Sequence, residues 1–238
     1  MTNILLKGSL GSGKSTIATE LENSWGYKKF SIARPVKEMT EILLKRKIDK
    51  KTDRTLLQQV GQYFKTSLDQ IHLFNPNFVK YIDDSLNDNE QFKEYYEKYK
   101  KYLFDTDCWL NILSESDPNF IHYLKKGKVV IDDVRFLNEP KYINKINQDT
   151  IIVQVEANLN TIRERCIARD GLFNPEWLED ISEKEKDLIK PNVILISDTN
   201  RTIKEMVDDL IDYYLISDTN RTIKEMVDDL IDYCIILR

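Results

Sequence analysis

The chain has a glycine-rich motif near its start. It matches the pattern G-x-x-x-x-G-K-[ST] in full and reads Gly8-Ser9-Leu10-Gly11-Ser12-Gly13-Lys14-Ser15. The apolar run at residues 3–7 before it predicts a strand, and the helical spacing of apolar residues over 15–25 predicts a helix after it. A strand, a glycine-rich turn and a helix, in that order, place backbone amides around phosphate oxygens. The stretch therefore predicts a phosphate-binding loop in an α/β protein.

Each position of this loop has an expected task toward a nucleoside triphosphate. The small residues let the backbone approach the phosphates closely, and they are Gly8, Gly11, Ser12 and Gly13. Lys14 is expected to reach the β- and γ-phosphates, Ser15 to ligate Mg²⁺ and Thr16 to help hold the α-phosphate. ATP and Mg²⁺ are therefore the expected cofactors. The alternative, a glycine-rich turn without a ligand, is disfavoured by the complete motif and its context.

Hydrophobic periodicity extends the same pattern along the chain. Further strands are predicted over 27–33, 129–131, 151–155 and 193–196. Further helices are predicted over 35–43, 53–71 and 159–170. Strands that alternate with helices indicate a mostly parallel sheet flanked by helices, so the expected fold class is α/β.

Residues 73–107 differ in character from the rest of the chain. They combine charged and aromatic side chains, most densely over 92–102. Such a stretch can form a nucleic-acid patch, but its glutamates interleave with its lysines, which favours a solvated helix with i,i+4 ion pairs and a tyrosine face. We interpret 73–107 as a helical insertion that forms part of a substrate lid.

Composition and charge exclude several classes of protein. The 238 residues carry 35 Lys and Arg against 40 Asp and Glu, a net charge of −5, which disfavours general nucleic-acid binding. The apolar runs are only a few residues long, so no membrane partner is expected. The three cysteines form no CxxC pair and the chain has two histidines, so a zinc site is disfavoured and a reduced, cytoplasmic protein is expected.

The C-terminal part of the chain contains a letter-for-letter repeat. Residues 195–213 recur as 215–233. Two copies are too few for a solenoid, so we expect one domain over 1–214 and a tandem duplicate with a tail over 215–238. A helix rotates by about 200° over the repeat period, so a single helix would point the two apolar stripes apart, and a break near 217–220 is expected. We expect the first copy to pack on the sheet, and the second to need another partner, for which a second subunit in a homodimer is one candidate.

Two adjacent carboxylates follow the predicted strand 129–131. A phosphate-binding loop works with a carboxylate at the end of another strand, and Asp132 and Asp133 occupy that place. One of them is expected to hold the Mg²⁺ shell together with Ser15, and the sequence does not decide which. The alternative is a carboxylate that caps the following turn.

A more specific run begins at the second carboxylate and reads Asp133-Val134-Arg135-Phe136-Leu137-Asn138-Glu139. With this run the sequence resembles the deoxynucleoside monophosphate kinases of bacteriophages, within the nucleoside monophosphate kinase group. Weaker pieces of the same pattern are Ala33-Arg34-Pro35-Val36-Lys37, Leu57-Gln58-Gln59-Val60-Gly61 and Ser182-Glu183. Their order and spacing resemble the family over most of residues 3–213. The resemblance implies a three-layer P-loop fold with a five-stranded, mostly parallel sheet.

The resemblance also implies a reaction. The γ-phosphoryl group of ATP would pass to a deoxynucleoside monophosphate and give the diphosphate, with small-molecule nucleotides as substrates. A phage-encoded enzyme of this kind would act in the host cytoplasm. The acceptor phosphate is already anionic, so the reaction needs positive charge, metal and alignment more than a general base. The preferred base is not readable from the sequence.

Several residues would serve the acceptor if the resemblance holds. Arg135 is expected to hold the acceptor phosphate at the transfer point, and Arg34 and Lys37 are expected acceptor-phosphate or base-side contacts. An ordinary charge pair at a helix start is the alternative for Arg34 and Lys37. Asn138 and Glu139 are expected to orient Arg135 or to contact the substrate, with a plain helix N-terminus as an equal alternative.

Arginines on the predicted helix 159–170 form the last group. In the family, the region that corresponds to 163–183 closes over ATP, and its arginines neutralise charge during transfer. Arg165 and Arg169 lie four positions apart and share a helix face, whereas Arg163 points elsewhere and is expected to stack on adenine. The expected catalytic residues are Lys14, Asp133, Arg135, Arg165 and Arg169.

Other functions stay open on the sequence alone. A small-molecule kinase of the same architecture, similar to phosphomevalonate kinase, shares an Asp-x-Arg after the strand. A P-loop ATPase that acts as a switch would hydrolyse ATP without an acceptor and would not need Arg34 and Arg135. A third option is that the duplication has made the chain an oligomerising variant or a folding test object.

Overall fold

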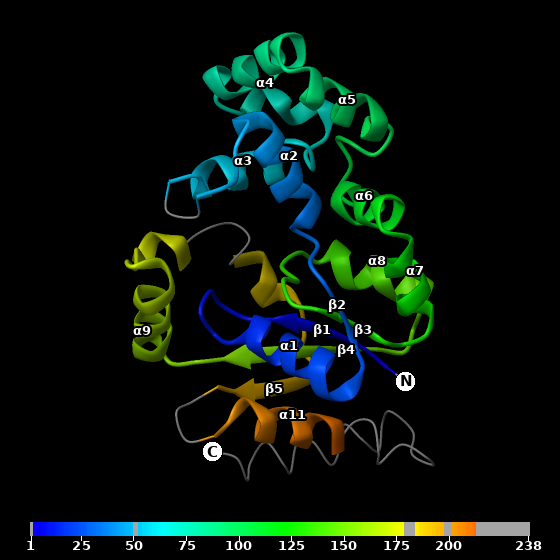
Figure 1. Ribbon diagram of the computed structural model, residues 1–238, viewed down its shortest axis with the longest axis vertical. Coiled ribbons are helices and arrows are strands. Elements are labelled where there is room, and N and C mark those ends of the chain that lie inside the picture. The colour runs from blue at the N-terminus through cyan, green and yellow to red at the C-terminus, as the bar shows by residue number, and fades with distance from the viewer. Residues whose placement is uncertain (1, 50–51, 179–183, 198–200, 213–238) are drawn as a thin grey trace. The chain divides into compact units, whose positions relative to one another are not determined.

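The chain folds into two compact units. The computed structural model describes residues 2–49, 52–178, 184–197 and 201–212. The sheet unit consists of Met1–Phe30 and the chain from His122 onward, and the helical unit consists of Ser31–Ile121. Figure 1 shows the elements of both units along the chain.

A parallel sheet forms the centre of the sheet unit. Its strands are β1 (Asn3–Lys7), β2 (Lys28–Phe30), β3 (Val129–Ile131), β4 (Thr150–Glu156) and β5 (Val193–Ile196). They lie in the order β2-β3-β1-β4-β5, and each neighbouring pair is parallel. Helices flank the sheet, so the expected α/β fold with a five-stranded, mostly parallel sheet is confirmed (Figure 1).

The second strand is shorter than the sequence predicted. The prediction of a strand over 27–33 is wrong beyond residue 30, where β2 ends. β2 is an edge strand, and it pairs with β3 as Lys28–Phe30 against Val129–Ile131. Because β3 itself has only three residues, β2 has no further backbone to pair with, and the chain turns into the next helix at Arg34.

Two helices pack on one face of the sheet and complete the core. They are α1 (Lys14–Trp25) and α11 (Ile203–Ile211), and α11 lies beside β5 (Figure 1). The helices and the strands contribute to one cluster of buried side chains, which includes Ile4, Leu6, Ile17, Leu21, Val130, Val153, Val155, Val207 and Leu210. The first copy of the repeat therefore packs on the sheet. The second copy at 215–233 and the predicted break lie outside the described residues.

α11 begins with a complete capping box. The Thr202 hydroxyl accepts a hydrogen bond from the Glu205 backbone N–H at 3.2 Å, and the Glu205 carboxylate accepts one from the Thr202 N–H at 2.7 Å. These two bonds satisfy two N–H groups that have no partner within the helix. Bonds to the backbone and hydroxyl of Thr202 also lower the pKa of Glu205.

Two further helices belong to the described part of the sheet unit. They are α8 (Asn138–Ile146) and α9 (Leu159–Asp170), followed by two short 3₁₀ turns at Pro175–Leu178 and Lys186–Leu188. Helix α7 (Pro118–Lys125), which the sequence analysis did not predict, contains the boundary between the two units. No helix in the described ranges has both the length and the apolar character that a membrane span needs.

The helical unit consists of short helices. They are α2 (Arg34–Leu44), α3 (Arg54–Tyr63), α4 (Pro76–Asp88), α5 (Glu90–Tyr99) and α6 (Cys108–Ser116), with the 3₁₀ segment η1 (Leu68–Leu73). α4 and α5 show that the predicted insertion at 73–107 is helical. The unit extends beyond that insertion at both ends, and α6 was not predicted from the sequence.

Aromatic rings form much of the core of the helical unit. Tyr63 packs edge-on against four other rings at centroid distances of 4.9 to 5.8 Å, those of Phe64, Phe74, Phe78 and Phe104. Edge-to-face packing at these distances stabilises such pairs beyond the area they bury. The cluster joins α3 to α4 and to the loop before α6.

The single helix predicted over 53–71 is wrong after Tyr63, where α3 ends. The Thr66 hydroxyl donates to the Gln62 carbonyl at 2.8 Å, and the backbone at Ser67 is extended. Hydroxyl side chains that bond nearby backbone groups compete with helix propagation. The apolar spacing continues across this break into η1, so periodicity alone could not reveal it.

Candidate functional site

The glycine-rich loop joins the carboxyl end of β1 to α1. Gly8 has φ +144°, and a Cβ atom there would lie 2.2 Å from the Val155 carbonyl oxygen. Gly13 has φ +104°, and a Cβ atom there would lie 3.1 Å from Ser197 Oγ. Residues with side chains rarely adopt such φ values, so the loop requires glycine at both positions.

The Lys14 ammonium is held by the loop itself. Its Nζ donates to the carbonyl oxygens of Gly8 and Ser9, each at 2.7 Å. The Ser12 hydroxyl lies 3.4 Å from the same nitrogen. The loop backbone therefore fixes a positive charge at the loop, as a lysine that binds phosphate oxygens requires.

The start of α1 favours an anion. Gly13 is its N-cap residue, and the first turn contains no acidic side chain. Ser15 and Thr16 are exposed in that turn. Backbone N–H groups at a helix start and the helix dipole both attract negative charge, so loop and helix together can bind phosphate.

The carboxylate of Asp132, at the end of β3, is tied to the start of α1 by a lysine. Lys29 Nζ lies 3.2 Å from Asp132 Oδ2, 3.1 Å from the Ser15 carbonyl oxygen and 3.3 Å from Thr19 Oγ1. Asp132 is buried and Asp133 is half-buried. The sequence analysis missed Lys29. No signal in the sequence separates it from its neighbour Lys28, which also reaches α1, through Glu22 at 3.1 Å.

The oxygen donors present here suit Mg²⁺. Ser15 offers a hydroxyl, and Asp132 and Asp133 offer carboxylates. Mg²⁺ prefers such hard oxygen ligands and is usually held by one or two carboxylates together with phosphate oxygens and water. The contacts of Lys29 bring the first turn of α1 next to the end of β3, so the donors lie on neighbouring elements.

Glu139 supports the loop after β3. It is 5% exposed, and its Oε2 accepts hydrogen bonds from the backbone N–H of Arg135 at 2.7 Å and of Phe136 at 3.0 Å. α8 begins at Asn138, in agreement with the helix N-terminus that was one of the two interpretations, and both Glu139 bonds go to backbone N–H groups. The Glu139 oxygen that makes these bonds fixes the backbone from which the half-buried Arg135 side chain extends.

The arginines of α9 have different surroundings. Arg165 Nη1 lies 3.4 Å from the Gly11 carbonyl oxygen, 3.3 Å from that of Ser12 and 3.0 Å from Ser197 Oγ. Arg169 pairs with its neighbour Asp170, with 2.8 Å between Nε and Oδ1, and this pairing raises the pKa of Arg169. The Arg163 side chain is exposed. The structure thus brings Arg165, and not Arg169, into contact with the loop.

Ser197 is a further residue of the site that the sequence analysis missed. It follows β5, is fully buried and donates its N–H to the Glu156 carbonyl at 2.7 Å. Its hydroxyl contacts Arg165 and lies beside Gly13. Its place directly after the fifth strand was the available signal, because the carboxyl ends of parallel strands meet at one edge. The Ser182-Glu183 pair lies outside the described residues.

A buried lysine directly precedes the loop. Lys7 Nζ donates to the carbonyl oxygens of Lys186 at 3.0 Å and Ile189 at 2.5 Å, and burial lowers the pKa of Lys7. A cavity of about 240 Å³ lies next to it. Its lining includes Lys7, Gly8, Ser9, Gln154, Glu156 and Asp187. The sequence analysis missed Lys7 because a lysine at the end of an apolar strand normally reaches solvent.

In the helical unit, the predicted residues lie at the start of α2. Arg34 Nη1 pairs with Asp117 Oδ2 at 2.9 Å, and its Nε lies 3.7 Å from Glu38 Oε1. Lys37 is exposed. Within this unit, the structure therefore gives Arg34 two acidic partners, in agreement with the charge pair at a helix start that was the alternative interpretation.

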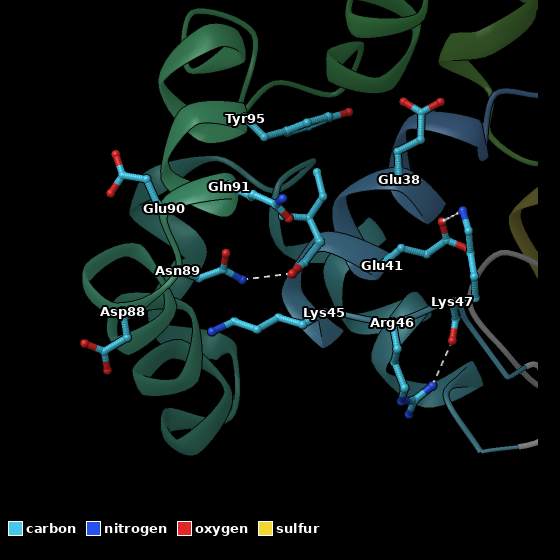
Figure 2. A pocket seen from close by; sticks show the side chains of 11 residues that line it. Glu38, Glu41, Lys45, Arg46, Lys47, Asp88, Asn89, Glu90, Gln91 and Tyr95 are labelled. Atoms are coloured by element: carbon cyan, nitrogen blue, oxygen red, sulfur yellow. Dashed lines mark hydrogen bonds and ion pairs between the residues drawn. The ribbon is translucent and has the colours of Figure 1, made fainter.

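A larger pocket of about 730 Å³ lies at the other end of α2. Figure 2 shows its lining side chains, which come from α2, the following turn, the end of α4 and the first part of α5. They are strongly charged and partly paired among themselves, as Lys47 is with Glu41 at 2.6 Å. None of the described residues that the sequence analysis proposed for function lines this pocket.

Comparisons with known proteins show the fold. No family model matches the chain, and no curated protein matches its sequence. A candidate kinase from Chloroflexus aurantiacus is similar in structure, with 16% identity, 92% of this chain and 97% of the other covered, and a TM-score of 0.50.

Two further solved structures have lower TM-scores. TT1252 from Thermus thermophilus is 18% identical, with 92% of this chain and 98% of the other covered, and a TM-score of 0.48. A dephospho-CoA kinase from Campylobacter jejuni is 16% identical, with 89% and 96% covered, and a TM-score of 0.38. At these identities the likeness is one of fold alone.

Proposed function

We propose that this protein is a kinase that transfers the γ-phosphoryl group of ATP, with Mg²⁺, to a deoxynucleoside monophosphate. The observation that carries the proposal is the phosphate-binding loop, in which the loop carbonyls hold the Lys14 ammonium at the start of α1. The run from Asp133 to Glu139 favours a nucleotide as acceptor, and it follows β3, the neighbour of β1 in the sheet.

The proposed transfer matches the chemistry of these groups. An acceptor-phosphate oxygen attacks the γ-phosphorus, the bond from the γ-phosphorus to its bridging oxygen breaks, and ADP leaves with that oxygen and the electron pair. The attacking oxygen is already deprotonated at neutral pH, so positioning and positive charge do most of the catalysis. Bound Mg²⁺ supplies charge to the phosphate oxygens.

The donor nucleotide is proposed to bind to the sheet unit. Backbone amides of the loop and of the first turn of α1 would hold its phosphates, with Gly8, Gly11, Ser12 and Gly13 giving the close approach. Lys14 would neutralise the β- and γ-phosphates, and Thr16 would hold the α-phosphate. Ser15 with Asp132 or Asp133 would hold Mg²⁺.

Three arginines are proposed to serve the transferred and accepting phosphates, and a fourth is proposed to contact the adenine. Arg135 would bind the acceptor phosphate, supported by the bond of Glu139 to its backbone N–H. Arg165 and Arg169 would neutralise developing charge, and Arg163 would stack on adenine. Arg165 contacts the loop carbonyls, which directly supports its proposed role at the phosphates. Arg169 pairs with Asp170, which gives less support to the same role.

Acceptor contacts, partners and location complete the proposed function. Arg34 and Lys37 would contact the acceptor. Small-molecule nucleotides would be the only substrates, without a nucleic-acid or membrane partner. The enzyme would act in the cytoplasm, that of the host if it is phage-encoded, and a homodimer would bring the second copy of the repeat into an interface.

The test is ADP formation from ATP and Mg²⁺ with dTMP, dGMP, dCMP or dAMP, beside a reaction without acceptor. We expect ADP to form only with an acceptor and to reveal the preferred base. Equal ADP formation without acceptor would indicate an ATPase switch. No ADP with any of the four nucleotides would contradict the proposed acceptor class, and a phosphomonoester without a base would be the next acceptor to test.

Two variants separate the residue roles. Lys14→Ala should abolish transfer with any acceptor, by a factor on the order of a thousand, because the γ-phosphate loses its neutralising charge. Arg135→Ala should impair use of the acceptor far more than binding of ATP. Equal losses for acceptor and ATP would contradict the role given to Arg135.

A further inference from the structure

The ammonium group of Lys29 contacts several oxygen atoms of the sheet unit. Its Nζ has three oxygen atoms within 3.3 Å, from Asp132, Ser15 and Thr19. An ammonium has three N–H donors, so these oxygens can use all of them. The side chain of Lys29 is 25% exposed and that of Asp132 is 9% exposed, so the ion pair is largely withdrawn from water.

We propose that Lys29 is a positioning residue of the metal side of the phosphate site, which fixes Asp132 against the first turn of α1. The inference rests on the proposed function, because it concerns the Mg²⁺ that accompanies ATP. The proposal also gives the two carboxylates different roles. Lys29 holds Asp132 against α1, and Asp133 contacts the metal shell.

The geometry explains why one ammonium can have this effect. Lys29 belongs to β2, Asp132 follows β3, and Ser15 and Thr19 belong to α1. The Thr19 hydroxyl also donates to the Ser15 carbonyl at 2.8 Å, so the acceptors on α1 are linked to each other. Ser15 carries the hydroxyl expected on Mg²⁺, and its own carbonyl is held by Lys29. A change at Lys29 therefore moves both sides of the expected metal site.

Charge also couples Lys29 to Asp132. Removing only the lysine would leave a buried carboxylate without its cation, which is costly and displaces the chain around it. Removing both charges would leave no such carboxylate, although the link between β3 and α1 would still be lost. The two single variants and the double variant therefore form a cycle in which Lys29 and Asp132 act as one unit.

The experiment measures nucleotide binding at increasing Mg²⁺ concentration, with a methylanthraniloyl-labelled ATP as the fluorescent probe. The variants are Lys29→Met, Asp132→Asn, the double variant and Lys29→Arg. The matched control is Lys28→Met, the neighbouring lysine in the same strand, which is 51% exposed and pairs with Glu22 at 3.1 Å. Urea unfolding of every variant separates folding from binding.

We expect Lys29→Met to raise the Mg²⁺ midpoint about tenfold, as loss of a group that orients metal ligands typically does. The double variant should match the single variants and not multiply their effects, and Lys29→Arg should recover most of the loss. Lys28→Met should behave as the unchanged protein does. If Lys29→Met does not fold, the double variant carries the same test.

Three outcomes would overturn the inference. The first is an unchanged Mg²⁺ midpoint in a folded Lys29→Met or double variant. The second is a lowered midpoint, which would mean that Lys29 only repels the metal. The third is an effect of the double variant equal to the product of the single effects. Failure of the unchanged protein to bind the labelled ATP would instead overturn the proposed function, and the inference with it.

Discussion

The sheet unit and the helical unit are stabilised by different means. In the sheet unit, aliphatic side chains fill the core, and glycines and paired charges shape the edge where the strands end. In the helical unit, a cluster of aromatic rings around Tyr63 fills the core. The difference indicates that substitutions of polar side chains at the strand ends should affect chemistry first, and that substitutions of core rings in the helical unit should affect stability first.

The largest expected effect falls on the helical unit. Phe64 is fully buried and contacts the rings of Tyr63, Phe92, Phe104 and Trp109. Phe64→Ala should therefore destabilise this unit by about 4 kcal/mol. Hydrogen exchange, read segment by segment, should show the loss of protection within 31–121. Equal loss of protection in the sheet unit would mean that the two units unfold together, and would break the comparison.

The two units also differ in what their glycines do, since Gly8 lies in a loop at a positive φ and Gly61 lies within a helix. Gly8→Ala should destabilise the sheet unit by about 3 kcal/mol, since the new Cβ atom would meet the Val155 carbonyl at 2.2 Å and φ is unfavourable. Gly61→Ala is the control in α3, where the new atom would lie 3.4 Å from Val36 and helix propensity would improve. It should be neutral or slightly stabilising. Urea unfolding of both variants measures the contrast, and a reversed order would contradict it.

A smaller effect is expected for a buried serine hydroxyl at the sheet edge. Ser197→Ala removes the oxygen 3.0 Å from Arg165 Nη1 and should weaken nucleotide binding by about fivefold, the equivalent of roughly 1 kcal/mol. Ser114→Ala is the control in the helical unit, where the hydroxyl donates to the Leu110 carbonyl at 2.7 Å. It should leave nucleotide binding unchanged. Fluorescence titration with the labelled ATP measures both, and similar losses in both variants would show that Ser197 has no special place at the site.

The smallest expected effect is the pH dependence of an ion pair that stabilises the helical unit. Arg46 lowers the pKa of Asp53 to about 2 through a direct ion pair, so the pair stabilises the helical unit above the ordinary pKa of an aspartate. That stabilisation is lost as the pH falls from about 5 toward 2. Arg46→Met should therefore lower Tm by roughly a few degrees at pH 6 and have almost no effect near pH 2. A constant difference across this range would show that Arg46 acts through packing and not through charge.

The sequence predicted the parts of the fold whose information is local. The loop from Gly8 to Ser15 and four of the five strands were identified closely, because a motif or a period of apolar residues marks each of them. The break after Tyr63 was missed because it depends on the Thr66 hydroxyl and on rings that arrive from α4 and later segments. Local periodicity does not contain that information.

The candidate site could also be predicted from the sequence only where its information is local. The residues that would touch phosphate follow from the motif, whereas Lys7, Lys29 and Ser197 are defined by contacts with distant segments of the chain. A lysine in a strand gives no sign of whether it will face solvent or a carboxylate on the next strand. For Arg165 and Arg169 the helix period was read correctly, but their partners differ because each guanidinium reaches a different neighbour.

The two core helices of the sheet unit begin in different ways. α11 satisfies its own first turn through Thr202 and Glu205, whereas α1 starts at a glycine and has no acid in its first turn. Under the proposed function, the phosphates of the nucleotide complete the start of α1, so the substrate also serves as a folding cofactor. Each tenfold increase of nucleotide above its dissociation constant would add about 1.4 kcal/mol to the stability of the enzyme. A cell that runs low on triphosphate would then lose enzyme molecules to proteolysis as well as turnover, which would link the abundance of the protein to the supply of its own substrate.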